Sequence, residues 1–128
     1  MGGRPHGGAD TRASSVTAAL SIAGYSGPGF TFLGYLPRKP GEMRRLLATL
    51  AADPRPAVAF ESPYRVRKSL AIIAEVMPDR QLTVARELTK LHEQLLRGTA
   101  SEVLAALSDP PRGEFTLVIS GQDRPPGA

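Results

Sequence analysis

Hydrophobic residues along the chain follow two spacings, one typical of helices and one typical of strands. In three segments the apolar side chains recur every three or four residues, which places them on one face of a helix: residues 14–24, 42–52 and 63–76. Four short apolar and β-branched runs are typical of buried strands: residues 30–36, 57–60, 82–85 and 115–119. Strands alternating with helices predict an α/β fold, a mixed sheet of about five strands flanked by helices.

Capping and turn residues mark several boundaries of these elements. Ser62 offers an N-cap hydroxyl and Pro63 suits the first helical position, so the third helix is expected to begin there. Residues 91–97 predict a further strand or hairpin arm, which we expect to be antiparallel to its neighbour. Thr99 or Ser101 is expected to cap a last helix.

The pattern predicts one folded domain over residues 14–121. Residues 1–13 and the tail 122–128 carry no periodic apolar face and are expected to be disordered. No apolar run approaches the roughly 18 residues that span a bilayer, and the first residues lack the apolar stretch of a signal peptide. We therefore expect a cytoplasmic protein without a membrane partner.

Composition narrows the classes of partner and cofactor. Lysine and arginine number 16 against 12 acidic residues among 128, a net charge of +4 that favours a polyanionic partner such as RNA. The chain has no cysteine, which excludes disulfides and thiolate metal sites. Its two histidines, His6 and His92, are far apart in the sequence, so no metal site is expected.

Charged residues gather where predicted strands end. In open α/β sheets, ligands bind outside the carboxyl ends of the strands, so such residues are candidates for a binding site. A surface turn with local ion pairs, each contributing less than about 1 kcal/mol, explains them equally well. The segments in question are 37–39 together with Arg44, 61–65, 86–90 and 112–114.

Single residues in these segments leave both interpretations open. Arg38, Lys39 and Arg44 fit a solvated basic face as well as a binding surface. Glu61 is expected near a helix N-terminus, which favours a carboxylate without any functional role. His92 stands beside Glu93 and could act as a general base, although a lone histidine on a strand is more often structural.

Five segments, in this order, resemble the bacterial 16S rRNA 2'-O-ribose methyltransferases known as methyltransferase I, within the tetrapyrrole methylase superfamily. The resemblance covers residues 14–121, the predicted domain. The segments are Ser14-Ser-Val-Thr-Ala-Ala-Leu20, Gly34-Tyr-Leu-Pro-Arg-Lys39, Phe60-Glu-Ser-Pro-Tyr-Arg65, Ala85-Arg-Glu-Leu-Thr-Lys-Leu-His-Glu93 with Arg97-Gly98, and Arg112-Gly-Glu-Phe-Thr-Leu-Val-Ile119.

The resemblance implies an enzyme with two α/β domains and S-adenosylmethionine in the cleft between them. Such enzymes methylate the ribose of a cytidine in the decoding region of the small ribosomal subunit. This chain resembles the C-terminal domain only, so it would form one wall of the cleft and would be inactive alone. The implied partners are 16S rRNA, the N-terminal methylase domain and, by the habit of the superfamily, a second copy in a homodimer.

The resemblance also assigns roles to residues. It places Ser15 and Thr17 near the carboxylate side of the methyl donor. Along the adenosine side it places Glu61, Ser62, Arg86, Glu87, Glu114 and Phe115. It assigns contacts with RNA phosphates to the basic residues Arg38, Lys39, Arg44, Arg65 and Lys90. The proton of the ribose hydroxyl would pass to Glu87 or Lys90, and the sequence does not choose between them.

Two departures from the family pattern bear on these roles. Residues 10–13 read Asp-Thr-Arg-Ala where Pro-Gly is usual, and Tyr64 stands where histidine is usual. The glycine-rich, aspartate-containing loop of the family's first domain has no counterpart here. A non-catalytic RNA-binding or dimerisation module, or a fragment without a role of its own, therefore remains an alternative to the enzyme domain.

Overall fold

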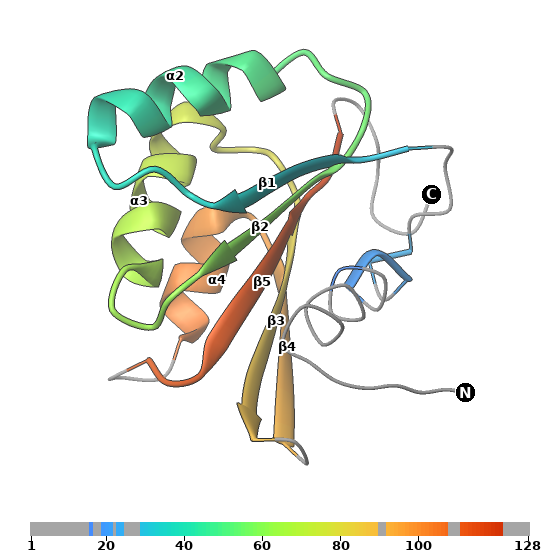
Figure 1. Ribbon diagram of the computed structural model, residues 1–128, viewed down its shortest axis with the longest axis vertical. Coiled ribbons are helices and arrows are strands. Elements are labelled where there is room, and N and C mark those ends of the chain that lie inside the picture. The colour runs from blue at the N-terminus through green and yellow to red at the C-terminus, as the bar shows by residue number, and fades with distance from the viewer. Residues whose placement is uncertain are drawn as a thin grey trace.

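The sheet has five strands in the order β1-β2-β5-β3-β4 and carries the helices α2, α3 and α4 on one face (Figure 1). This computed structural model describes residues 16, 19–21, 23–24, 29–89, 92–107 and 111–121. The strands are β1 (Thr31–Tyr35), β2 (Ala57–Glu61), β3 (Leu82–Thr89), β4 (His92–Gly98) and β5 (Glu114–Ile119). The helices are α2 (Pro40–Leu50), α3 (Val66–Val76) and α4 (Ala100–Ala106).

The sheet is mixed. β1 and β2 are parallel, whereas β5 runs antiparallel to both of its neighbours, β2 and β3, and β4 runs antiparallel to β3. The predicted mixed sheet with flanking helices is thus confirmed, as is the antiparallel arm over residues 91–97, which is β4. The predicted disordered ends, 1–13 and 122–128, lie outside the described residues.

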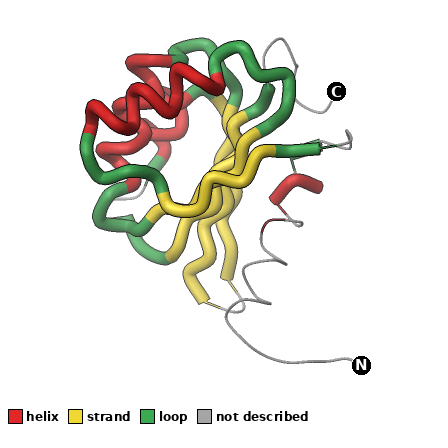
Figure 2. Tube along the Cα trace, turned by 45° about the horizontal axis from the view of Figure 1, so that its top comes forward, coloured by secondary structure: helices red, strands yellow, loops and turns green. Residues whose placement is uncertain are grey.

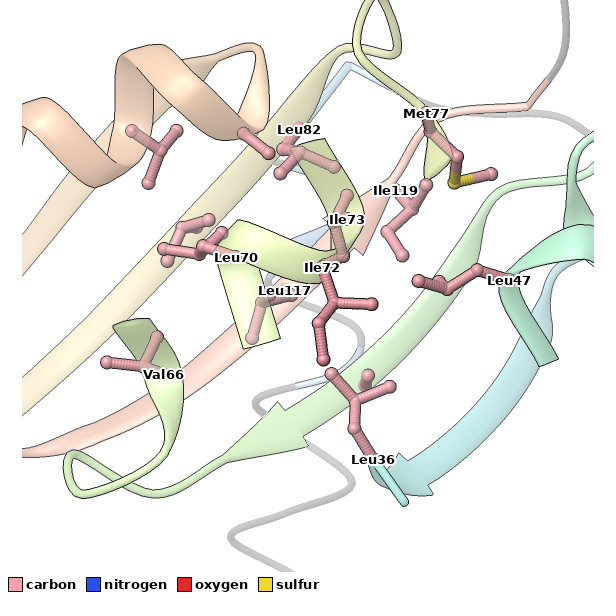
Figure 3. Close-up of a cluster of buried hydrophobic side chains, with 14 of the residues drawn as sticks. Leu36, Leu47, Val66, Leu70, Ile72, Ile73, Met77, Leu82, Leu117 and Ile119 are labelled. Atoms are coloured by element: carbon pink, nitrogen blue, oxygen red, sulfur yellow. The ribbon is translucent and has the colours of Figure 1, made fainter. Parts of the chain in front are cut away.

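The main core fills the space between the sheet and the helices α2, α3 and α4 (Figures 1 and 2). Leu70 and Ile73 of α3 belong to the same buried cluster as Leu117 and Ile119 of β5 (Figure 3). The opposite face of the sheet, which we call the second face, carries Val58 and its cross-strand partner Val118. These two valines pack with Ala19, so a helical segment that includes residues 19–21 covers this part of the second face (Figure 2). All five residues of β2 are buried because that strand is covered on both faces.

The helix predicted to start at Pro63 begins three residues later, at Val66, and the cap predicted at Ser62 is wrong. The Ser62 carbonyl accepts hydrogen bonds from the backbone N–H groups of Arg65 (3.2 Å) and Val66 (3.0 Å), which closes a turn before the helix. The Ser62 N–H donates to the Glu61 carboxylate at 3.0 Å. The buried Glu61 carboxylate thus binds a backbone N–H of the turn before this helix, and no serine hydroxyl caps the helix.

Thr99, rather than Ser101, caps α4. Its hydroxyl accepts from the N–H of Glu102, whose carboxylate accepts from the N–H of Thr99 in return, the reciprocal pair known as a capping box. In the part of the chain that the structure describes, no helix has the length and apolar character to cross a membrane.

Strand β3 is twice as long as predicted, because it runs to Thr89 instead of ending at Ala85. Pairing with β4 on one side and β5 on the other extends the strand through Arg86 and Glu87. These two charged residues therefore lie within a strand and not after it, which corrects the sequence-based expectation. Since side chains alternate along a strand, the two point to opposite faces of the sheet.

Candidate functional site

The strand register places four charged segments at one end of the sheet, which we call the charged end: residues 37–39, 61–65, 86–89 and 112–114. It comprises the carboxyl ends of β1, β2 and β3 and the amino ends of β4 and β5. β2 and β3 both pair with β5 in this region, where Glu61 and Arg86 lie opposite Phe115 from either side and Glu87 lies opposite Glu114. Segments up to about 75 positions apart in the sequence thus come together in space.

The residues at the charged end divide between the two faces of the sheet. Glu61, Phe115, Arg86 and Gln94 form one cross-strand row on the face that α2, α3 and α4 cover. Glu87 and Glu114 are exposed and lie on the second face. The predicted adenosine-side residues therefore share one end of the sheet but do not share one face.

Glu61 lies at the centre of a buried hydrogen-bond network and is only 1% exposed. One carboxylate oxygen accepts from the Ser62 N–H and lies 3.6 Å from Arg65 Nε, while the other accepts from the Ser69 hydroxyl at 2.5 Å. Arg65 also donates to the carbonyl of Pro37 at 2.9 Å. The network ties the loop after β1 to the loop after β2, so Glu61 and Arg65 hold the charged end in shape.

Arg86 is 6% exposed, and its guanidinium carbon lies 6.0 Å from the centre of the Phe115 ring. Two of its nitrogens, Nε and Nη1, are buried without an acceptor. The side-chain oxygen of Gln94, the cross-strand partner of Arg86, is buried without a donor. Unpaired buried polar groups are costly and uncommon in native proteins, so this pair is chemically competent to take up a polar or anionic group.

The second face carries a row of three carboxylates at the charged end. Glu87 lies opposite Glu114 of β5 on one side and Glu93 of β4 on the other, and all three are exposed. The Tyr35 hydroxyl donates to Glu114 Oε1 at 3.3 Å. Among the described residues no group of three or more histidines and acids is close enough to hold a metal ion.

Of the five basic residues predicted to contact RNA, the four that the structure describes differ in what they already bind. Arg38 and Lys39 are exposed in the loop between β1 and α2. Arg44 of α2 makes two hydrogen bonds of 2.6 and 3.1 Å to Glu75 of α3. The side-chain hydrogen bonds and the charge of Arg44 hold the pKa of Glu75 below its ordinary value. Arg65, as described above, is held by Glu61 and Pro37.

Three of the predicted site residues, Ser15, Thr17 and Lys90, lie outside the described residues, and their roles stay predictions. Ser62 is half-buried, with its N–H bound to Glu61.

Sequence reasoning missed Gln94, because only strand pairing reveals that it lies beside Arg86. It also assigned no role to Tyr64, which is 95% exposed, although the unusual tyrosine at that motif position was a signal.

Comparison with known proteins places the chain in a family. Residues 13–104 match the family model of the Tetrapyrrole (Corrin/Porphyrin) Methylases. The chain belongs to this family. Two solved structures share its fold at 19% and 18% identity: the methyltransferase CobJ, with a TM-score of 0.56, and the cobalt precorrin-4 methyltransferase CbiF, with a TM-score of 0.55. Each match covers 83% of this chain and 47% or 48% of the other.

Curated relatives of this family member are named ribosomal RNA small subunit methyltransferase I. The protein from Neisseria meningitidis serogroup B is 46% identical over 110 residues, which are 84% of this chain and 38% of the relative. Those from Thermotoga maritima and Bacillus subtilis are 41% and 38% identical and are covered to 50% and 38% of their lengths. The chain therefore spans half or less of the length of these relatives.

Proposed function

We propose that this chain is the C-terminal domain of an S-adenosylmethionine-dependent methyltransferase that acts on a ribose 2'-hydroxyl of small-subunit rRNA. The observation that carries the proposal is 46% identity, over 84% of the chain, to a relative named ribosomal RNA small subunit methyltransferase I. In this proposal the chain forms one wall of the cofactor cleft and contacts the RNA. An rRNA substrate would also place the enzyme in the cytoplasm.

The residues at the charged end fit the chemical groups of S-adenosylmethionine. Exposed carboxylates such as Glu87 and Glu114 suit its amine, its ribose hydroxyls and its sulfonium charge. The unpaired nitrogens of Arg86 suit a carboxylate. Because Arg86 and Glu87 belong to opposite faces, we expect only part of the predicted set to touch the donor directly. Glu61 and Phe115, both 1% exposed, would act by holding the others in place.

When bound, S-adenosylmethionine supplies an electrophilic methyl group on a sulfonium. A ribose hydroxyl is a weak nucleophile, so the protein must hold it in line with that methyl group and must remove its proton. Glu87 is an exposed carboxylate able to accept a proton, and its neighbours Glu93 and Glu114 lie on adjacent strands. Lys90 is the alternative base.

A chimera tests the proposal. Residues 16–121 of this chain replace the matching segment of the N. meningitidis relative, and the purified chimera is assayed for transfer of a tritiated methyl group from S-adenosylmethionine to small ribosomal subunits. We expect RNA methylation by the chimera, and none by the 128-residue chain alone. A folded chimera that neither binds S-adenosylmethionine in calorimetry nor methylates RNA would contradict the proposal.

The same chimera tests the proposed base. At saturating S-adenosylmethionine, Glu87→Gln should lower the transfer rate by roughly a hundredfold, since general base catalysis typically contributes at least that much, and calorimetry measures separately how much donor affinity the lost charge removes. The matched control is Glu42→Gln, an exposed glutamate in the first turn of α2, which should keep the full rate. An unchanged rate in Glu87→Gln would leave Lys90 as the candidate, to be tested by Lys90→Met.

The alternative is a non-catalytic RNA-binding or dimerisation module. Such a module would bind RNA but would give no heat of binding when titrated with S-adenosylmethionine.

We also expect the protein to form a homodimer. Phe32, Tyr35 and Leu95, all between 40% and 55% exposed, provide apolar contact area on the second face. Light scattering of the purified chain measures its oligomeric state directly.

A further inference from the structure

We propose that Tyr64 stacks on an unpaired base of the RNA substrate while Arg38 and Lys39 contact the phosphates beside it. The inference rests on the proposed function, in which the substrate is RNA. It assigns a role to a residue outside the predicted set of site residues.

Tyr64 is 95% exposed, far more than any other large apolar side chain among the described residues, the next being Phe32 at 54%. Its ring makes almost no contact with the folded chain, so it contributes little to the stability of this fold. Single exposed apolar residues are normal on protein surfaces. What distinguishes Tyr64 is that hydrogen bonds hold its turn on both sides and that the adjacent loop carries cations.

The turn that carries Tyr64 is anchored on both sides. Hydrogen bonds from the N–H groups of Arg65 and Val66 to the Ser62 carbonyl close the turn. The Ser62 N–H and the Arg65 side chain both engage the buried carboxylate of Glu61. Because the backbone of this turn is already ordered, binding would order only the rotamers of the ring and would cost no backbone entropy.

The loop beside the Tyr64 turn carries cations. Arg65 donates to the Pro37 carbonyl at 2.9 Å, which brings the Tyr64 turn beside the segment that continues into Arg38 and Lys39. Both of these residues are exposed, as is Lys68 in the first turn of α3. Of the acids in this region, Glu61 is paired with Arg65, Glu42 lies on α2, and Glu114 accepts a hydrogen bond from Tyr35 on the second face.

An exposed aromatic ring with flanking cations is the arrangement that binds single-stranded nucleic acid. The ring stacks on a base of any identity, and lysines and arginines follow the backbone. Protein interfaces also use tyrosine and arginine but are depleted in lysine, whereas the loop beside the Tyr64 turn continues into Arg38 and Lys39, which suit a polyanion. RNA is therefore the occupant that these residues favour.

A tryptophan reporter provides the test, because the chain contains no tryptophan. In the Tyr64→Trp variant of the full chain, a single-stranded oligoribonucleotide should quench the tryptophan fluorescence in a saturable, salt-sensitive way. The matched control is Phe32→Trp, whose side chain is half-exposed on the second face and should show no quenching. Quenching by intact small subunits but not by naked RNA would assign Tyr64 to a protein contact and would overturn the proposal.

Affinity measurements by fluorescence anisotropy complete the test. Tyr64→Ala should weaken RNA binding by about tenfold and leave the salt dependence unchanged, since the ring contacts no phosphate. Tyr64→Phe should restore the affinity because it keeps the stacking surface. If the wild-type chain binds RNA and Tyr64→Ala binds it equally well, the stacking role fails while the proposed function stands. If neither the wild-type chain nor the chimera binds RNA, both fail.

Discussion

At the scale of the residue, two glutamates of similar sequence context have different roles in the structure. Glu61 and Glu87 both belong to motif segments at strand ends, yet Glu61 is buried among hydrogen-bond donors and Glu87 is exposed. The distinction follows from the alternation of side chains along paired strands. Glu61 lies across from Phe115, in the row that faces the helices, whereas Glu87 lies across from Glu114 on the second face.

Replacing Glu61 tests its structural role. Glu61→Ala should lower the free energy of unfolding by about 2 to 4 kcal/mol, because the Ser69 hydroxyl and the Arg65 guanidinium lose a buried acceptor. Glu61→Gln, which keeps one acceptor oxygen, should cost less. Urea unfolding followed by circular dichroism measures both, with Glu42→Ala on the exposed side of α2 as the control. Equal stability of Glu61→Ala and Glu42→Ala would exclude the network as a stabilising element.

At the scale of the element, strand pairing and helix caps set boundaries that local patterns left uncertain. β3 exceeds its apolar run because partners on both sides satisfy the backbone groups of its charged half. α3 begins late because the Glu61 carboxylate binds the Ser62 N–H and the Arg65 side chain donates to the distant Pro37 carbonyl, and together these contacts hold the preceding turn. α4 begins where the local capping residues predict, since its cap needs no distant partner.

The cap of α4 can be tested separately. Thr99→Ala removes the hydroxyl that accepts from the Glu102 N–H and should lower the free energy of unfolding by about 1 kcal/mol. Thr99→Ser keeps the hydroxyl and should remain within a few tenths of a kcal/mol of the wild type. The two urea midpoints provide the comparison. If serine were as destabilising as alanine, the loss would come from the methyl group of Thr99 and not from the cap.

The ion pair between α2 and α3 makes a pH prediction. Glu75 has its pKa lowered by Arg44, so the pair stabilises the folded state above the ordinary pKa of a glutamate, about 4.3. This stabilisation is lost as the pH falls through the lower pKa of the folded state. Glu75→Gln should therefore reduce stability at pH 6 and make no difference at pH 2, as measured by urea unfolding. Since both side chains are exposed, 1 M salt should shrink the effect at pH 6.

At the scale of the whole molecule, the fold gathers charged segments at one end of the sheet. The net charge of +4 attracts a polyanion but does not say where the polyanion lies. The loop between β1 and α2, which carries Arg38 and Lys39, lies at the charged end. Arg55, another exposed cation, precedes β2 and lies at the opposite end of that strand.

Salt dependence distinguishes these two ends. The affinity of the chain for single-stranded RNA should fall as salt rises, and Lys39→Ala should reduce the slope of log affinity against log salt by about 1. Arg55→Ala should leave that slope unchanged, because Arg55 lies at the far end of the sheet. Equal slopes in both variants would indicate a diffuse electrostatic attraction without a binding surface at the charged end.

Local chemistry in the sequence determined much of this protein. Apolar spacing predicted the strands and helices, their alternation predicted an α/β domain, the net positive charge favoured a polyanionic partner, and the motif segments identified the family. These signals are readable because they depend on residues within one turn or one strand of each other.

Only the tertiary structure decided on which face of the sheet each charged residue lies. The pairing of β3 with β5 put Arg86 beneath the helices and Glu87 on the second face, and the pairing of β3 with β4 brought Gln94 beside Arg86. The turn at Ser62 and the Arg65 contact to Pro37 likewise set Tyr64 beside a basic loop. Such relations join residues far apart in the chain, so they depend on strand register and packing, which no local pattern specifies.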